Sequence, residues 1–220
     1  MPDASALVLS PPESAANKLL YRRRKRMNYP LQLSFEVLSI ARKLSVIDAA
    51  GNLNFYVKQK AFKLKESVTV FADADQKLPL YELAADRVID FSANYHFKDG
   101  RGTHVGTVRR KGMKSLWRAR YDIVNGSARA LTIQEANPWA KVCDALFSEI
   151  PILGMFSGYV FHPEYIVARE DGTPLMRLKK EPAFFQGKFS IEKLGVVSEE
   201  EEKRILLSLI MMVLLEKQRG

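Results

Sequence analysis

A run of eleven consecutive residues near the end of the chain, Ile205 to Leu215, contains a single polar side chain, Ser208. Four glutamates, Glu199 to Glu202, lie before the run, and Lys217 and Arg219 lie after it. Carboxylates favour the N-terminal end of a helix and cations the C-terminal end, and Ser198 is a suitable N-cap. The segment therefore predicts a helix over 199–218 that is apolar on every face and must be buried all round.

Either a bilayer or a protein core could bury such a helix. A membrane-spanning helix needs ~20 apolar residues to cross ~30 Å of hydrocarbon. Eleven helical residues cover only ~16 Å, about half of that thickness. The length favours a core helix over a tail anchor, so we expect a protein that is not integral to a membrane.

The chain between residue 29 and about residue 197 has the texture of β-strands. Short segments rich in Val, Ile, Phe, Tyr and Thr alternate apolar with polar residues. Turn sequences start 25 or 26 residues apart, at Asp48, Asp73, Asp99 and Asn125. The next turn, at Asp171, comes 46 residues later, and the excess predicts one inserted helix over 137–151. Many short antiparallel strands at even spacing predict a barrel or a sandwich.

A closed antiparallel barrel of about twelve strands would supply the place that the apolar helix needs. The interior of so wide a barrel is too large for strand side chains alone, and a helix can fill it. We therefore predict one mainly β domain over 29–220, with the C-terminal helix at its centre. Residues 1–28 predict a disordered basic tail.

The strand texture is clearest in two segments, LSVIDAAGNLNFYVKQKAFKLKESVTVF and AREDGTPLMRLKKEPAFFQGKFSIEKL, and the apolar helix follows them. In these features the chain resembles the LURP-one-related and phospholipid scramblase family. The resemblance implies the tubby C-terminal-like fold, a twelve-stranded barrel around a central apolar helix. It also makes phospholipid binding or scramblase-like lipid transfer a function to consider. The scramblases carry a cysteine cluster, whereas this chain has one cysteine, so lipid transfer is the weaker alternative.

Catalytic and metal-binding motifs are missing from the sequence. There is no Gly-x-Ser-x-Gly elbow, no His-Glu-x-x-His and no phosphate-binding loop. His96 and His104 flank one hairpin and could approach each other, but two histidines without a third ligand make a poor zinc site. Cys143 has no evident histidine partner and is expected to be a small buried hydrophobe. We expect no enzyme, no metal site and no cofactor.

The chain carries 34 Lys and Arg against 25 Asp and Glu, a formal net charge of +9. Such a balance favours a polyanionic partner, either nucleic acid or an anionic membrane. The sequence shows no recognition helix and no zinc finger, which makes nucleic acid the less favoured partner. A single cysteine fits a reducing compartment. We expect a cytoplasmic protein that can be peripheral at the inner face of a membrane.

Basic residues follow three of the turns by seven to nine positions. A strand of about seven residues covers ~23 Å, so these residues are expected at the barrel end opposite the turns. They should converge there within one Debye length, ~8–10 Å, with a gap at ELAADR, 82–87. The predicted site for anionic lipid headgroups or a phosphoinositide-like ligand consists of Lys58, Lys60, Arg109, Arg110, Lys111, Lys179 and Lys180.

A second basic feature lies in the predicted tail, at Arg22, Arg23, Arg24, Lys25 and Arg26. Near an anionic membrane each such charge contributes ~1 kcal/mol of attraction. The alternative interpretation of all this charge is solubility, in which case the domain would be a structural or regulatory protein-interaction module.

Overall fold

The computed structural model describes residues 26–36, 42–59, 67–86, 93–111, 120–126, 128–136, 164–182 and 187–217. These residues form twelve β-strands and one long helix, α4. The elements are β1 Leu31–Phe35, β2 Arg42–Ile47, β3 Leu53–Gln59, β4 Ser67–Phe71, β5 Pro79–Ala85, β6 Asn94–Asp99, β7 His104–Lys111, β8 Arg120–Asn125, β9 Ala128–Glu135, β10 Glu164–Ala168, β11 Pro174–Glu181, β12 Lys188–Lys193 and α4 Glu199–Lys217.

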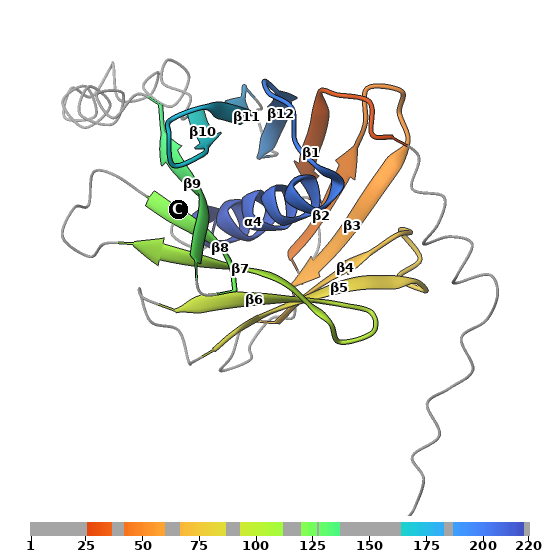
Figure 1. Ribbon diagram of the computed structural model, residues 1–220. Coiled ribbons are helices and arrows are strands. Elements are labelled where there is room, and N and C mark those ends of the chain that lie inside the picture. The colour runs from red at the N-terminus through yellow and green to blue at the C-terminus, as the bar shows by residue number, and fades with distance from the viewer. Residues whose placement is uncertain are drawn as a thin grey trace, which may run out of the picture.

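The twelve strands form a closed antiparallel barrel, as predicted (Figure 1). Each strand pairs with its neighbours in sequence, and β1 closes the barrel against β12 with Leu31 opposite Ile191. Closure leaves no unpaired sheet edge, which removes the usual route to edge-to-edge aggregation.

The evenly spaced turns are tight hairpins that each use an aspartate or a glycine in a specific way. Asp48 Oδ1 accepts hydrogen bonds from the backbone N–H groups of Ala50 and Asn52, at 3.0 and 2.9 Å. Asp99 repeats this pattern with the N–H groups two and four residues later. Gly51 and Gly102 follow with a backbone φ of +80°. Residues that carry a Cβ atom adopt this conformation only at a cost in free energy.

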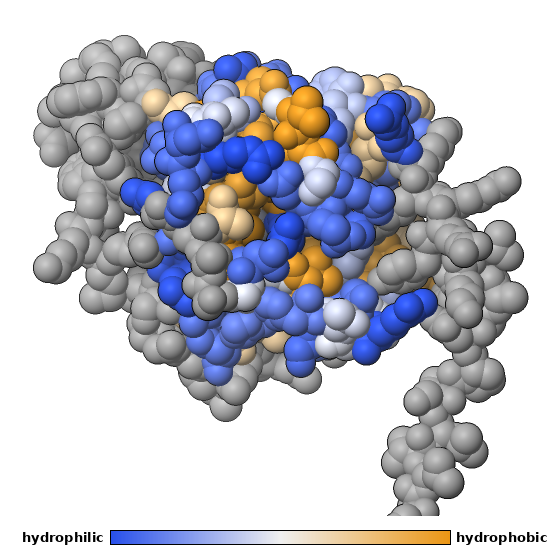
Figure 2. All heavy atoms as spheres, in the orientation of Figure 1, coloured by the Kyte–Doolittle hydropathy of each residue, from blue (hydrophilic) through white to orange (hydrophobic). Residues whose placement is uncertain are grey.

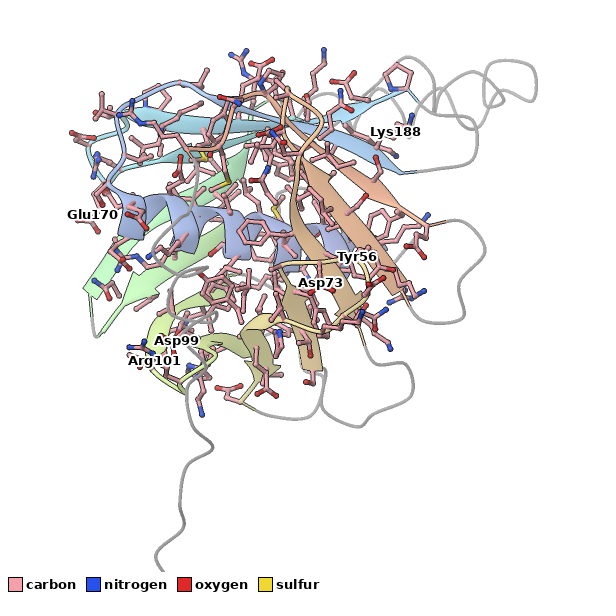
Figure 3. All side chains as sticks on the ribbon, turned by 90° about the vertical axis from the view of Figure 1, so that its right-hand side faces the viewer. Tyr56, Asp73, Asp99, Arg101, Glu170 and Lys188 are labelled. Carbon is pink, nitrogen blue, oxygen red and sulfur yellow. The ribbon has the colours of Figure 1, made fainter. Side chains whose placement is uncertain are left out.

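The two ends of the barrel differ in their connections. We call the end that carries the short turns after β2, β4, β6, β8 and β10 the hairpin end. The other end, where β1, β3, β5, β7, β9 and β11 finish, is called the loop end. Figure 3 shows Asp99, Arg101 and Glu170 at the hairpin end and Lys188 at the loop end.

Helix α4 runs through the barrel from the hairpin end towards the loop end (Figure 1). All residues from Ile205 to Leu215 are buried, together with the inward side chains of the strands. The prediction of a centrally buried helix is confirmed, with α4 ending at Lys217. Among the described residues, no helix is long and apolar enough to cross a bilayer.

Polar contacts hold α4 at both of its ends. At its start, the Ser198 side chain accepts from the Glu201 N–H, and the Glu201 carboxylate accepts from the Ser198 N–H, which is a capping box. Arg169 also pairs with Glu201, and this contact lowers the pKa of the carboxyl group. At the far end, the Tyr121 hydroxyl donates to Glu216 Oε1 at 2.8 Å. The helix is therefore fixed along its axis.

Ser208 is the exception within the apolar run, because its hydroxyl is buried and has no hydrogen-bond partner among the residues that the structure describes. A buried hydroxyl that lost its water partners opposes folding. We expect Ser208→Ala to stabilise the barrel by about 1 kcal/mol, or ~2–4 °C in Tm. Thermal unfolding followed by circular dichroism measures this, and a lower Tm would show that the hydroxyl is satisfied.

Several predicted segments lie outside the described residues. They are the tail as far as residue 25, the inserted helix over 137–151 with Cys143, and Lys60. The outer face of the described barrel shown in Figure 2 is mostly hydrophilic, with hydrophobic patches towards its middle. This matches strands that alternate inward apolar with outward polar residues.

Candidate functional site

The described basic residues of the predicted site lie on strands that finish at the loop end. Lys58 is the last residue but one of β3, and Arg109 to Lys111 end β7. Lys179 and Lys180 precede the last residue of β11. The three groups are called the β3, β7 and β11 clusters below. They occupy one barrel end because each follows a hairpin turn by one strand length.

The prediction that these clusters converge at one place is wrong. Strands β3, β7 and β11 are four positions apart in the closed twelve-strand order, so the clusters are spread evenly around the end. Neighbouring strands lie ~4.8 Å apart, which puts the clusters ~19 Å apart along the wall. This exceeds the Debye length of ~8–10 Å, and no compact ligand could touch all three.

The basic side chains also point in different directions. Lys58 donates to Gln76 Oε1 at 2.8 Å, and Arg109 Nε donates to Asn94 Oδ1 at 2.6 Å. Arg110 is half-buried, with its guanidinium carbon 6.0 Å from the centre of the Tyr121 ring. Alternation along the strand explains the difference, because Val108 and Arg110 point inward and Arg109 points outward. Arg110 therefore belongs to the inner mouth of the barrel.

Both lysines of the β11 cluster, Lys179 and Lys180, are exposed. Lys179 lies opposite Ser190 and Lys180 opposite Phe189 on β12. Neither lysine makes an ion pair or hydrogen bond within the described chain. Their positive charge is thus available to an external partner.

Sequence reasoning missed the basic residues on the adjoining strands. The register places Lys43 of β2 opposite Lys58, and Arg120 of β8 opposite Lys111. Lys188 of β12 lies opposite Glu181. A signal existed, because the strand after each loop starts at the end where the preceding strand finishes.

A family model for LURP-one-related proteins matches residues 31–153, the part of the chain from β1 to beyond β9. The chain belongs to the LURP-one-related family. No curated protein matches its sequence. A solved porin-like protein from Bacteroides uniformis is 8% identical, with 75% of this chain and 95% of that chain covered at a TM-score of 0.22, too low to carry an argument.

Acidic residues separate the basic clusters of this LURP-one-related barrel. Glu36 follows β1, Asp86 follows β5 and Glu135 ends β9. The gap in positive charge that was predicted at 82–87 therefore has counterparts at the ends of β1 and β9. Around the loop end, basic and acidic strand ends alternate.

His96 and His104 of the LURP-one-related chain do approach each other across the β6–β7 hairpin. Their ring centres are 5.9 Å apart, and His96 Nδ1 and His104 Nε2 each lie 3.0 Å from Thr107 Oγ1. In the described part of the chain, no group of three metal-binding side chains comes together. The pair forms a hydrogen-bonded bridge between the two strands.

The tail enters the LURP-one-related barrel at the hairpin end. The Asn28 carbonyl accepts from the Ala49 N–H at 2.9 Å, and the Tyr29 hydroxyl donates to Glu202 at 3.1 Å. Arg26 is exposed just before them, while Arg22 to Lys25 lie outside the described residues. The described chain therefore starts far from the three basic clusters.

Proposed function

We propose that this LURP-one-related chain is a non-enzymatic module that docks its loop end on a membrane surface rich in anionic phospholipid headgroups. The observation that supports this most is the even spread of three basic clusters around one barrel end. Because the three clusters lie around the same end of the barrel, a flat surface of anionic headgroups can contact all of them at once.

The spacing of the clusters favours a surface over a single headgroup. A phosphate group accepts hydrogen bonds from donors ~3 Å away, so one headgroup can engage only one cluster. Clusters ~19 Å apart along the wall would instead meet separate headgroups. The proposed partner is accordingly a membrane with many anionic lipids, and binding should add up over the clusters.

Cross-strand neighbours at the loop end support a role in binding rather than in stability. Like charges directly opposite each other destabilise a strand pair. Lys43 lies opposite Lys58 in the strand register. Glu36 offsets part of this repulsion through an ion pair with Lys43 at 3.4 Å. The remaining positive charge costs stability, which fits selection for an anionic partner.

The sequence of two loop-end connections has the composition that suits a membrane interface. Between β3 and β4 the chain reads KAFKLKE, and between β7 and β8 it reads GMKSLWRA. Aromatic and aliphatic residues mixed with lysine and arginine are typical of segments that lie at the headgroup level. These residues lie outside the described part of the structure, and only their composition supports the proposal.

Neutralising one residue in each cluster tests the proposal. The triple variant Lys58→Gln, Arg109→Gln, Lys179→Gln should bind phosphatidylserine-containing vesicles roughly a hundredfold more weakly, because each cation contributes ~1 kcal/mol near the surface. Each single variant should weaken binding about fivefold. Vesicle co-sedimentation at low salt gives the affinities, and added salt should weaken all of them.

A matched control removes three charges from the hairpin end, through Lys98→Gln, Arg101→Gln and Lys193→Gln. None of these residues lies in the turn after β4 that contacts Lys58. This variant has the same net charge as the first and should keep most of the vesicle affinity. Equal losses in both triples would mean that net charge alone attracts the protein. A wild-type chain that ignores anionic vesicles at low salt would favour the protein-interaction alternative instead.

A further inference from the structure

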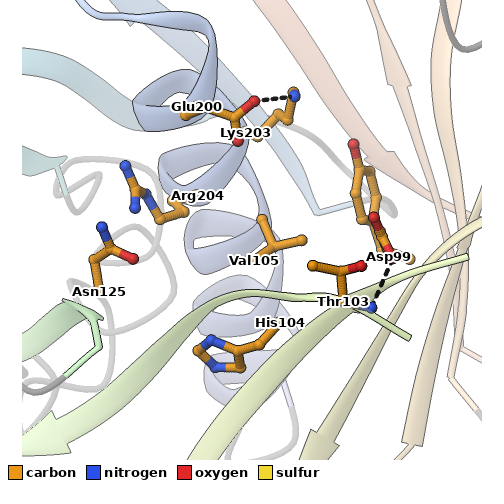
Figure 4. A pocket seen from close by; sticks show the side chains of 9 residues that line it. Asp99, Thr103, His104, Val105, Asn125, Glu200, Lys203 and Arg204 are labelled. Carbon is orange, nitrogen blue, oxygen red and sulfur yellow. Dashed lines mark hydrogen bonds and ion pairs between the residues drawn. The ribbon is translucent and has the colours of Figure 1, made fainter. Parts of the chain in front are cut away.

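A cavity of about 370 Å³ opens at the hairpin end, between the first turns of α4 and the barrel wall. Its lining includes Tyr81, His104 and Asn125 from the strands and Lys203 and Arg204 from the helix (Figure 4). The volume falls within the range of small-molecule sites. The cavity is at the opposite end of the barrel from the proposed membrane surface, so a ligand in it would bind whether or not the loop end docks on a membrane.

Arg204 is a cation at the cavity without an anionic partner in the described part of the chain. The acidic first turn of α4 is fully engaged elsewhere: Glu199 and Glu200 pair with Lys203, and the next two glutamates pair with Arg169 and Lys193. Arg204 itself makes no hydrogen bond or ion pair within the described chain, although it is half-buried. A partly desolvated guanidinium without an anion is unfavourable unless a ligand supplies one.

Gly106 holds the stem of Arg204 in place. A Cβ atom at position 106 would lie 2.9 Å from Arg204 Cδ, closer than real Cβ atoms approach, and 3.0 Å from Arg204 Cγ, which is tighter than most real contacts. Glycine inside a strand weakens the sheet and often marks a close approach. Here the missing side chain lets the aliphatic part of Arg204 rest on β7, which positions the guanidinium at the cavity.

Two further polar groups line the same cavity. Figure 4 shows the side chains of Asn125 and Arg204 near each other on one side, with His104 below them. The Asn125 amide has no hydrogen bond within the described chain. His104 uses Nε2 towards Thr107 and keeps Nδ1 for another partner. Together these side chains offer several nitrogen groups to one oxygen-rich ligand.

The carboxylates in the lining make no ion pair with Arg204 in the described chain. Asp99 accepts hydrogen bonds from the backbone N–H groups of Arg101 and Thr103 within its own turn. Glu200 pairs with Lys203 at 2.6 Å. The lining carries two carboxylates and two cations, so its formal charge is zero. Of these four groups, Arg204 alone has no partner in the described chain, which matches a ligand with one compact anionic group and disfavours a polyanion.

We propose that this cavity binds a small soluble molecule through a phosphate or carboxylate group held by Arg204. The planar guanidinium donates two parallel hydrogen bonds to such a group. The Asn125 amide donates a further bond to the same anion, and His104 contacts the rest of the ligand.

A nuclear magnetic resonance titration of the full chain tests this with inorganic phosphate and with acetate, at constant ionic strength. At least one of the two anions should cause saturable shifts of the Gly106 backbone amide and the Asn125 side-chain amide. Arg204→Met keeps the length of the stem and removes the charge, so it should bind at least about tenfold more weakly. Gly106→Ala should weaken binding too, by displacing Arg204.

Lys77→Met is the matched control, because Lys77 is an exposed cation of the same barrel end that pairs only with Asp75 in the described chain. It should leave the titration unchanged. Shifts that persist in Arg204→Met, or no saturable shift with either anion, would overturn the proposal. Arg204→Met decides the matter alone if Gly106→Ala does not fold.

Vesicles that contain phosphatidic acid separate a soluble ligand from a lipid headgroup. They should fail to compete with the anion for the cavity, since the proposed ligand is soluble. Sedimentation with these vesicles that is lost in Arg204→Met would contradict that assignment and make the cavity a headgroup site.

Discussion

Leu209→Asp should leave no cooperatively folded barrel. Leu209 is fully buried in the middle of α4. Removing a buried leucine side chain costs ~2–5 kcal/mol, and an unpaired buried carboxylate costs several kcal/mol more. The sum reaches the whole stability of a typical domain, ~5–15 kcal/mol. Near-UV circular dichroism and thermal unfolding should show the loss of fixed packing.

The neighbouring Ser208→Ala variant is the control for this experiment. It changes an adjacent helical position without introducing charge and should unfold cooperatively, as the wild type does. If Leu209→Asp also unfolds cooperatively near the wild-type temperature, α4 does not lie in the core.

Ending the chain at Glu202 should produce an insoluble or expanded protein. The missing segment includes the ten apolar side chains of Ile205–Leu215, all of them buried. Burial of a side chain of this size stabilises a fold by ~1.5–3 kcal/mol, so the loss is on the order of 15–30 kcal/mol. An empty barrel interior would also lack the close packing that native cores require.

A chain that ends at Lys217 provides the comparison, because it keeps α4 and loses only residues 218–220. It should be soluble, with the near-UV spectrum of the full chain. Gel filtration and near-UV circular dichroism distinguish the two truncations. A compact, soluble product that ends at Glu202 would mean that the strands form a stable barrel without the helix.

The fold was predictable because its signals are local. The apolar run at Ile205–Leu215 has no polar face, and its length rules out a simple span. The turns at Asp48, Asp73 and Asp99 use side chain to backbone hydrogen bonds a few residues apart, which leave a mark in the sequence. Even spacing of the turns then assigns each strand end to one end of the barrel.

The positions around the barrel were harder to predict than the positions along it. Convergence of Lys58, Arg109 and Lys179 failed because the angle between them depends on the total number of strands in the closed order. Arg110 points inward because it lies two residues after Val108, and side chains two residues apart on a strand point to the same face. The contact between Gly106 and Arg204 joins residues far apart in sequence, and only the glycine within a strand pattern hinted at it.

The position of α4 after all twelve strands has a consequence for synthesis in the cell. Ribosomes add ~5–20 residues per second, so on the order of 10–40 s separate the first residue of this chain from its last. Until the helix emerges, the nascent strands have nothing to enclose, and their edges and apolar faces stay open to other chains. Folding must therefore wait until α4 has been synthesised, and molecular chaperones that shield nascent strands should matter more for this protein than for one whose core is made first.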